Sequence, residues 1–202
     1  MNGPRISAVI PIRNRSGIRL ENCLRSLRWQ DCADDLEIIL SDLGSQTPHR
    51  ESIAALAQSY QARVVYSDYD GLWNRSLGLN IGIRHALGHY IFCTDADMIF
   101  APNFLSASLA VQSEQSDESM VLCACHDLPP YVPERIWSVE DFPRLQRSSH
   151  LRRTSGVGAC QVATRDFFET VHGYDEKYEF WGAEDVDMTS RASRYGLNLT
   201  WM

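Results

Sequence analysis

Short, almost uninterrupted apolar segments alternate with segments of helical periodicity through the first half of the chain. The apolar segments are residues 6–12, 36–42, 63–66 and 90–94. Between the first two, Leu20, Leu24 and Leu27 recur at the spacing of a helix face, and residues 51–60 and 74–87 are also predicted to be helical. Strands buried on both faces lose the alternation of polar and apolar residues, so this pattern predicts parallel strands joined by helices. We therefore expect an α/β protein: a mixed, mainly parallel sheet with helices on both faces.

The second half of the chain is less regular. Its periodicity predicts helices over residues 103–112, 164–171 and 184–195 and strands over residues 120–124 and 159–163. Residues 126–158 have no period of either kind, which is typical of a functional loop or lid. Residues 198–202 resemble a strand that is cut short.

Composition excludes several classes of protein. The 202 residues include 19 Lys and Arg against 26 Asp and Glu, a net charge of −7. An acidic chain is a poor partner for nucleic acid, which requires a clustered basic face. We expect no membrane span, since no segment approaches the ~20 apolar residues that cross a bilayer, and no secretory signal. Cys23, Cys93 and Cys160 lie in apolar segments, which favours buried, reduced thiols and a cytoplasmic location.

Two carboxylates follow the apolar segment 90–94. Asp95 and Asp97 come at the point where a parallel strand would end, which is where open α/β sheets bind ligands. Two close carboxylates repel each other unless a cation joins them. Oxygen ligands of this kind suit Mg²⁺ or Mn²⁺, which take further oxygens from a substrate phosphate.

Polar residues also follow the first two predicted strands, on the same sheet edge. Pro11, Arg13 and Arg15 come after the first strand, and Asp42 comes after the second. Either arginine is suited to contact a base, a ribose or a phosphate. Asp42 is suited either to accept a hydrogen bond from a uracil N–H or a ribose hydroxyl, or to cap its own turn.

Aromatic and acidic residues are interleaved between residues 173 and 187. Trp181 and Gly182 form a flat apolar platform with open backbone beside it, which suits the face of a sugar. Glu184 and Asp185 then begin a helix, where the partial positive charge of the N-terminus stabilises carboxylates. Helix capping alone explains one of these acids, but it does not explain the aromatic residues that precede them.

Residues 142–158 contain no acid and four arginines: Arg144, Arg147, Arg152 and Arg153. Two interpretations stand here. The segment is either a mobile loop that closes over a negatively charged partner, or a solvated loop.

In order and spacing, these motifs resemble the GT-A nucleotide-sugar glycosyltransferases of family 2. The chain is most similar to chondroitin-polymerase-type domains and, in Trp-Gly-x-Glu-Asp, to β-1,4-galactosyltransferases. The resemblance implies a uridine pocket, a metal held with the UDP diphosphate by Asp95 and Asp97, and a donor-sugar border at Gly156, Val157 and Gly158. The uridine pocket would be lined by Pro11, Arg13, Arg15, Asp42 and Asn80.

By the same resemblance, Trp181, Gly182 and Glu184 face the acceptor, and Asp185 is the catalytic base of inverting members. The implied function is an inverting transfer, dependent on Mn²⁺ or Mg²⁺, from a UDP-sugar donor to a hydroxyl of a glycan acceptor. Residues 1–202 would form one domain, with a nucleotide-binding half over about 1–100 and an acceptor-binding half over about 101–202. Relatives often supply a further metal ligand beyond residue 202, so either the metal site uses two carboxylates and waters, or the domain is truncated there.

Three alternatives stay open. Retaining UDP-sugar transferases share the fold but have Asn where this chain has Asp185. Sugar-nucleotide pyrophosphorylases share the layered sheet but carry a glycine-rich loop after the first strand, which Arg13-Asn14-Arg15 is not. The third alternative is not an enzyme but a non-catalytic domain that binds a nucleotide-sugar. His172 is expected to be a loop residue rather than a metal ligand.

Overall fold

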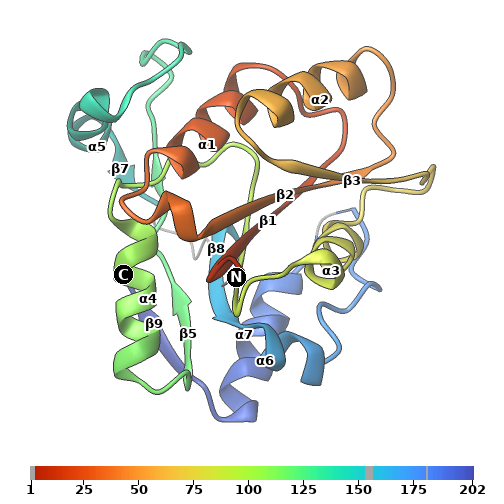
Figure 1. The fold of residues 1–202 in the computed structure, drawn as a ribbon, viewed down its shortest axis with the longest axis vertical. Coiled ribbons are helices and arrows are strands. Elements are labelled where there is room, and N and C mark those ends of the chain that lie inside the picture. The colour runs from red at the N-terminus through yellow and green to blue at the C-terminus, as the bar shows by residue number, and fades with distance from the viewer. Residues whose placement is uncertain (1–2, 153–156, 181) are drawn as a thin grey trace.

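A computed structural model describes residues 3–152, 157–180 and 182–202. Its centre is a seven-stranded sheet in the order β3-β2-β1-β4-β8-β5-β9 (Figure 1). The strands are β1 (Ile6–Ile12), β2 (Leu36–Leu43), β3 (Arg63–Ser67), β4 (Tyr90–Thr94), β5 (Ser119–Leu122), β8 (Cys160–Thr164) and β9 (Asn198–Trp201). The first four are parallel, β8 runs antiparallel to both β4 and β5, and β9 is parallel to β5. The expected mixed, mainly parallel sheet is confirmed.

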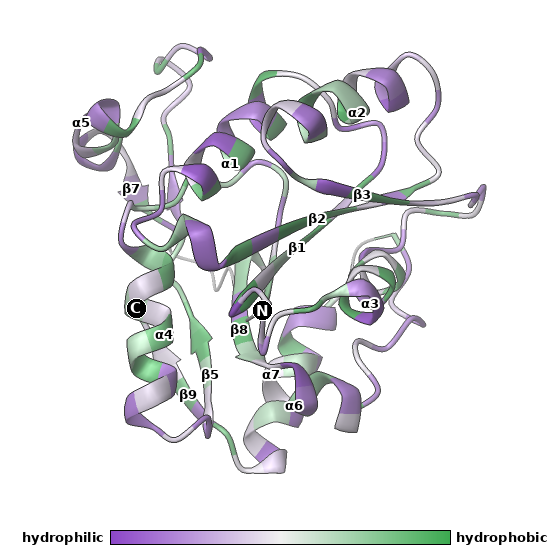
Figure 2. Ribbon diagram, in the orientation of Figure 1, coloured by the Kyte–Doolittle hydropathy of each residue, from purple (hydrophilic) through white to green (hydrophobic). Residues whose placement is uncertain are grey.

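Helices cover both faces of this sheet (Figure 1). One face carries α1 (Ile18–Arg28), α2 (His49–Ser59) and α4 (Phe104–Glu114), and the other carries α3 (Arg75–His85), α6 (Arg165–Thr170) and α7 (Glu184–Tyr195). Along β1, Ala8 and Ile10 join the first core cluster and Val9 joins the second. Burial on both faces is the reason that the strands read as continuous apolar segments, and Figure 2 shows the central strands as hydrophobic along their length.

The segment expected to lack structure contains short elements. They are β6 (His126–Asp127), a 3₁₀ turn η2 (Val139–Asp141), α5 (Phe142–Ser148) and β7 (His150–Leu151). Two anchors hold it to the rest of the molecule: Trp137 is buried, and its backbone N–H donates to the side chain of Asn22 on α1. These elements are too short to produce a detectable period, so the prediction of a structureless loop over residues 126–158 is wrong for the described part.

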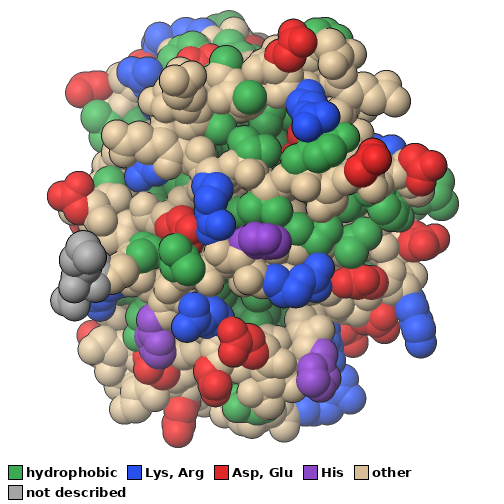
Figure 3. Space-filling model, turned by 45° about the vertical axis from the view of Figure 1, so that its right-hand side comes forward, with side chains coloured by type: hydrophobic (Ala, Val, Ile, Leu, Met, Phe, Trp, Pro, Cys, Tyr) green, Lys and Arg blue, Asp and Glu red, His purple; other side chains and the backbone are tan. Residues whose placement is uncertain are grey.

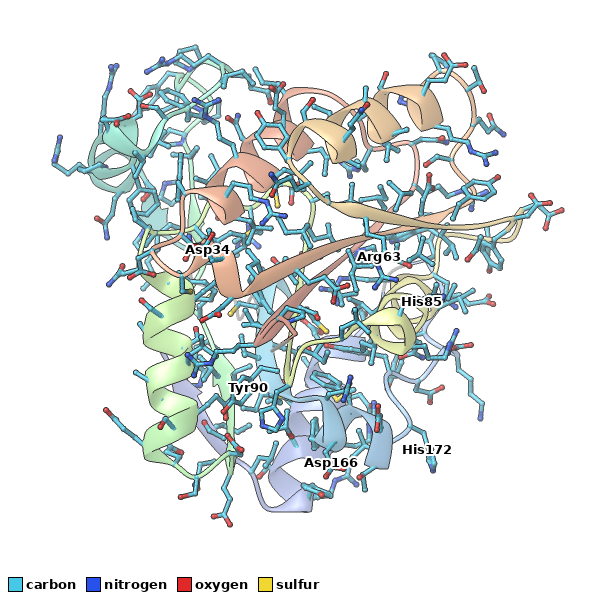
Figure 4. All side chains as sticks on the ribbon, viewed as in Figure 1. Asp34, Arg63, His85, Tyr90, Asp166 and His172 are labelled. Carbon is cyan, nitrogen blue, oxygen red and sulfur yellow. The ribbon has the colours of Figure 1, made fainter. Side chains whose placement is uncertain are left out.

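Local contacts explain where several elements begin and end. The side chain of Asn74 caps the N-terminus of α3 by accepting from the backbone N–H of Leu77, at 2.8 Å. At the other end of α3, Arg63 of β3 donates to the carbonyl of His85 (Figure 4). A cation at a helix C-terminus opposes the partial negative charge there. The contact from Arg63 ties α3 to the sheet, and α3 carries much of the site described next.

The surface is mixed in charge. On the face shown in Figure 3, acidic and basic side chains are intermingled rather than gathered into areas of one sign. Among the described helices, none has both the length and the apolar character that a bilayer crossing requires.

Candidate active site

The strand ends that carry the predicted site residues are neighbours. In the sheet, β1 lies between β2 and β4, and Pro11 and Ile12 pair with Ser41 and Asp42. Asp95 directly follows β4, on the other side of β1. The prediction that these motifs share one sheet edge is therefore confirmed at the level of the fold.

Arg75, the first residue of α3, connects this edge to the start of α7. Its Nε donates to Oδ1 of Asp95 at 2.8 Å, and its Nη2 donates to the carbonyl of Gly158 at 2.5 Å. Its Nη1 lies 3.5 Å from Oε1 of Glu184. The side chain is only 13% exposed. One buried guanidinium thus joins the predicted metal-binding carboxylate to a predicted acceptor residue.

The sequence analysis did not single out Arg75. One signal was present: an arginine in the first turn of a helix meets the unfavourable positive end of the helix dipole. Such a residue needs acidic partners, and here these are Asp95 and Glu184. The partners are 20 and 109 residues away along the chain, so local spacing does not reveal them.

Asp95 and Asp97 differ in their surroundings. One oxygen of Asp95 accepts from Arg75, while Asp97 is exposed and forms no hydrogen bond or ion pair with the described residues. The charge of Asp97 reaches the guanidinium groups of Arg19 and Arg152 and raises the pKa of each, behind the stronger effects of their own partners Glu134 and Asp127.

This donor set fits a divalent cation that shares its coordination with a ligand. Within residues 3–152, 157–180 and 182–202, no group of three His, Cys, Asp or Glu side chains is arranged to hold a metal alone. Mg²⁺ is commonly bound by one or two carboxylates together with water and substrate phosphate oxygens. Asp97 and the second oxygen of Asp95 can supply that share.

Asp42 is almost fully buried, with 1% of its surface exposed. Its Oδ1 accepts from the backbone N–H of Ser45 at 2.9 Å, so it does cap its turn. Its Oδ2 is buried and has no partner among the described residues. Buried polar atoms are normally hydrogen-bonded, and an orphaned carboxylate oxygen at a ligand-binding sheet edge is a suitable acceptor for a ligand N–H or hydroxyl.

The two arginines after β1 have different environments. Arg13 donates to the carbonyl of Gly71 at 2.6 Å, and its guanidinium lies 5.8 Å from the ring centre of Tyr69. Arg15 is exposed. Pro11, by contrast, is buried within β1. Arg13 is therefore pre-oriented at the sheet edge, whereas Arg15 is available to a ligand from solvent.

The side chain of Asn80, which is predicted to line the uridine pocket, forms hydrogen bonds with Tyr174 and Glu176. Its Nδ2 donates to the carbonyl of Tyr174 at 2.9 Å and to Oε1 of Glu176 at 2.8 Å. Its Oδ1 accepts from the backbone N–H of Tyr174 at 2.8 Å. The side chain is occupied in holding the segment that leads to α7. A contact of Asn80 with uridine stays a prediction, and the helical pattern over residues 74–87 did not indicate that this side chain meets a distant loop.

Glu184 and Asp185 open α7, as expected. Glu184 is buried, and burial raises its pKa despite the nearby charge of Arg75. Asp185 is half-buried, and its Oδ1 accepts from the backbone N–H of Val186 at 2.8 Å. Its carboxylate lies against Gly158: a Cβ at position 158 would be 2.7 Å from Oδ2 of Asp185. The absence of a side chain there leaves room for the carboxylate.

The remaining predicted residues are either exposed or outside the described part of the chain. Gly182 is exposed beside the ring of Tyr178. Trp181, Gly156 and Arg153 lie outside the described residues. His172 is an exposed loop residue with a φ of 58°, at the turn after α6 (Figure 4).

The arginines of residues 142–158 differ in their contacts. Arg144 and Arg147 lie on α5 and are exposed. Arg152, however, forms a two-pronged ion pair with Asp127 across the β6–β7 pair. An acid from outside the segment therefore neutralises one of its charges, which the sequence run by itself did not indicate.

The mixed sheet, with helices on both faces, has the GT-A fold of the glycosyltransferases to which it is structurally similar. The chain belongs to glycosyl transferase family 2, whose family model matches residues 7–171. A second family model, described as the N-terminal domain of galactosyltransferase, matches residues 143–202. The resemblance that the motifs indicated is confirmed.

Curated relatives are similar over nearly the whole chain. A validoxylamine A glucosyltransferase of Streptomyces hygroscopicus subsp. jinggangensis is 24% identical over 98% of this chain and 53% of its own length. The O-antigen biosynthesis protein RfbC of Myxococcus xanthus is 23% identical over 97% of this chain and 16% of its own. The chain thus spans about half or less of the length of these relatives.

Solved structures share the fold at low identity. A mannosyltransferase from Pyrobaculum calidifontis, in complex with GDP-Man and Mn²⁺, aligns with a TM-score of 0.72 at 19% identity, covering 100% of this chain and 55% of that one. TarS of S. aureus, residues 1–349 in complex with UDP, aligns with a TM-score of 0.72 at 16% identity, covering 98% and 57%.

Proposed function

We propose that this chain is the catalytic domain of an inverting, metal-dependent glycosyltransferase that moves a sugar from a UDP-sugar to a hydroxyl of a glycan. The observation that carries the proposal is the contact of Arg75 with both Asp95 and Glu184. It brings the donor carboxylates and the acids of α7 into one site. A purely nucleotide-binding domain has no need for that second set of acids.

The donor would bind along the ends of β1, β2 and β4. The unpartnered Oδ2 of Asp42 is suited to the N–H of uracil or to a ribose hydroxyl. Arg13 and Arg15 are suited to the base, the ribose or the phosphates. Two structural neighbours, one solved with UDP and one with GDP-Man, support a nucleotide or sugar nucleotide as the ligand of this fold. The choice of UDP over GDP is part of the proposal.

Asp95 and Asp97 would hold Mn²⁺ or Mg²⁺ together with the diphosphate. A bound divalent cation neutralises the charge of the departing diphosphate. Arg75 keeps one oxygen of Asp95 occupied and so orients this carboxylate. The Mn²⁺ in the mannosyltransferase complex supports this assignment.

The acids of α7 would act on the acceptor. Asp185 is the candidate general base, because its half-buried carboxylate lies beside Gly158, near the guanidinium that holds Asp95. Inversion requires a single in-line displacement, and one carboxylate within reach of the acceptor hydroxyl is then sufficient to take its proton. Glu184, engaged by Arg75, would hold an acceptor hydroxyl, with Trp181 and Gly182 beside the sugar face.

Ligand-dependent stability tests the donor part of the proposal. UDP with Mn²⁺ should raise the melting temperature, because a ligand that binds only the folded state stabilises it by mass action. Chelator should abolish the effect, and Asp97→Asn should weaken it. The matched control is Asp34→Asn, an exposed carboxylate remote from this edge (Figure 4).

The outcomes are distinct. A shift by UDP that persists in chelator would contradict the metal-dependent site. A larger shift with GDP than with UDP would assign the donor to the other nucleotide class. Release of UDP from a UDP-sugar in the presence of a glycan acceptor would then separate an enzyme from a binding domain.

A further inference from the structure

Gln161 is a completely buried polar residue, the second of the five residues of β8. Its Nε2 donates to the carbonyl of Asp185 at 2.9 Å and to Oγ1 of Thr189 at 3.0 Å. Thr189 in turn donates to the same carbonyl at 2.7 Å. The first turn of α7 is therefore fastened to the sheet at the backbone of the candidate base itself.

Tyr174 fixes the orientation of Gln161. The phenol of Tyr174 donates to Oε1 of Gln161 at 2.5 Å, which decides which end of the amide faces α7. Tyr174 is 2% exposed, and burial raises the pKa of its phenol further above the ordinary value, so it stays a donor.

Tyr174 is held in its turn from α3. Both the N–H and the carbonyl of its backbone bond to the side chain of Asn80. Gly173 makes this possible: its φ is +68°, and a Cβ there would lie 2.2 Å from Oδ1 of Asn80. A buried polar chain thus runs from α3 through Asn80, Tyr174 and Gln161 to Asp185.

Packing alone does not require this network of buried hydrogen bonds. The second core cluster around it is apolar, including Leu122, Ala163 and Met188. A buried amide contributes little net stability over an apolar side chain of similar shape, but a fully satisfied network specifies one arrangement. What the network specifies is the position of the first turn of α7 relative to β8. Gly158, three residues before Gln161 on the same segment, lies against the Asp185 carboxylate.

We propose that Gln161, oriented by Tyr174, is a positioning residue that aims the carboxylate of Asp185 at the acceptor hydroxyl. This inference rests on the proposed function, since it takes Asp185 to be the base. Asn80 is then the outermost member of the same network rather than a donor contact.

A double-mutant cycle tests the inference. Gln161→Met keeps the approximate size of the side chain and removes every hydrogen bond that it makes. In the otherwise unchanged protein it should lower kcat about 10- to 100-fold, because a displacement of about 1 Å is sufficient for such a loss. Binding of UDP with Mn²⁺ should be unchanged. In the Asp185→Asn background the same substitution should have almost no further effect on kcat.

Two further variants keep the test sharp. Tyr174→Phe removes only the phenol oxygen and should reproduce a smaller part of the same loss, including its disappearance in the Asp185→Asn background. Gln112→Met is the matched control: Gln112 is equally buried and also donates to β8, at the carbonyl of Val162, but it does so from α4, on the other face of the sheet. It should leave kcat unchanged.

The possible results separate the two proposals. Equal losses from Gln161→Met with and without Asp185 would overturn the positioning role while leaving the transferase intact. An unchanged kcat in both Gln161→Met and Tyr174→Phe would do the same. If the unaltered protein transfers no sugar from any UDP-sugar, the proposed function fails, and the positioning role fails with it.

Discussion

At the residue scale, the site depends on carboxylates that differ in burial and in the charges beside them. Glu184 and Asp185 are adjacent in sequence, but successive helical residues point ~100° apart. Glu184 is turned into the protein, toward Arg75, and Asp185 lies beside Gly158. Asp185 is therefore the candidate base, and Glu184 is a buried acid with a raised pKa. Each leads to a separate prediction.

Asp185→Asn should lower turnover by ~10²–10⁴-fold, the usual contribution of a positioned base. Donor binding should persist, since Asp185 does not belong to the proposed donor site. Steady-state kinetics and titration of UDP with Mn²⁺ measure the two effects separately. An α-linked donor should give a β-glycoside, which NMR coupling constants identify. An α-linked product, or normal turnover in the variant, would place the chain among retaining enzymes.

Glu184 should make stability depend on pH. Its pKa is raised by burial, so the folded protein holds this proton more tightly than the unfolded chain does. The stability that follows is fully present below the unfolded pKa, ~4.3. It is lost as the pH rises through the raised folded pKa. Glu184→Gln removes this titration, so the stability of the variant relative to the parent should increase as the pH rises above the unfolded pKa.

Denaturant unfolding at several pH values measures that difference. Glu114→Gln, at an exposed position on α4, is the control and should show a constant difference from the parent. A constant difference for Glu184→Gln as well would mean that Arg75 fully offsets the burial of the carboxylate.

At the scale of elements, the N-terminus of α3 is the junction on which the site depends. Asn74 accepts from Leu77 as the helix cap, and its Nδ2 donates to the carbonyl of Glu176 at 2.8 Å. Arg75 follows directly, so the cap sets the position from which the guanidinium reaches Asp95. The sequence predicted a helix over residues 74–87, and the structure places it at Arg75–His85 with Asn74 as its cap.

Asn74→Ala should destabilise the protein by about 1–2 kcal/mol, since it removes the cap of α3. Asn103→Ala supplies the comparison. Asn103 occupies the same N-cap position on α4 but makes no capping hydrogen bond through its side chain, so its loss should be much smaller. Denaturant midpoints measure both. Equal effects in the two variants would show that the observed cap contributes no stability of its own.

At the scale of the whole molecule, a single sheet separates two apolar cores. Phe92 lies in the first, with the rings of Phe100 and Phe104 at 5.2 and 5.3 Å between centroids. Phe168 lies in the second, beside Tyr174. Because every central strand contributes side chains to both cores, neither can open without exposing the other. One domain over residues 1–202 stays a prediction, which the shared sheet favours.

Phe92→Ala and Phe168→Ala should therefore each lower the free energy of unfolding, by about 3–5 kcal/mol. Both should shift the same single transition, observed alike by tryptophan fluorescence and by circular dichroism. Two separate transitions, each moved by only one of the variants, would contradict the single domain and would divide the chain into independently folding halves.

The sequence by itself determined the local and periodic features of this protein. Hydrophobic periodicity depends on neighbours a few positions apart, so it predicted β1, β2, β4, α3 and α7. Parallel strands bring their carboxyl ends to one edge, so the common location of Pro11, Asp42 and Asp95 also followed from the sequence. The short elements between residues 126 and 152 were missed because they have too few turns or pairs to show a period.

Only the tertiary structure decided which side chains meet. The bonds from Arg75 to Glu184 and from Asn80 to Tyr174 join residues 109 and 94 positions apart. The position of Arg75 in the first turn of a helix indicates a need for acidic partners but not which ones, and nothing local distinguishes Gln161 from a polar residue on an exposed strand. Their roles arise from burial, because a polar group removed from water must find its partner wherever the folded chain brings one. The helix pattern therefore located Asn80 on α3, but packing against residues 173–176 determined what it binds.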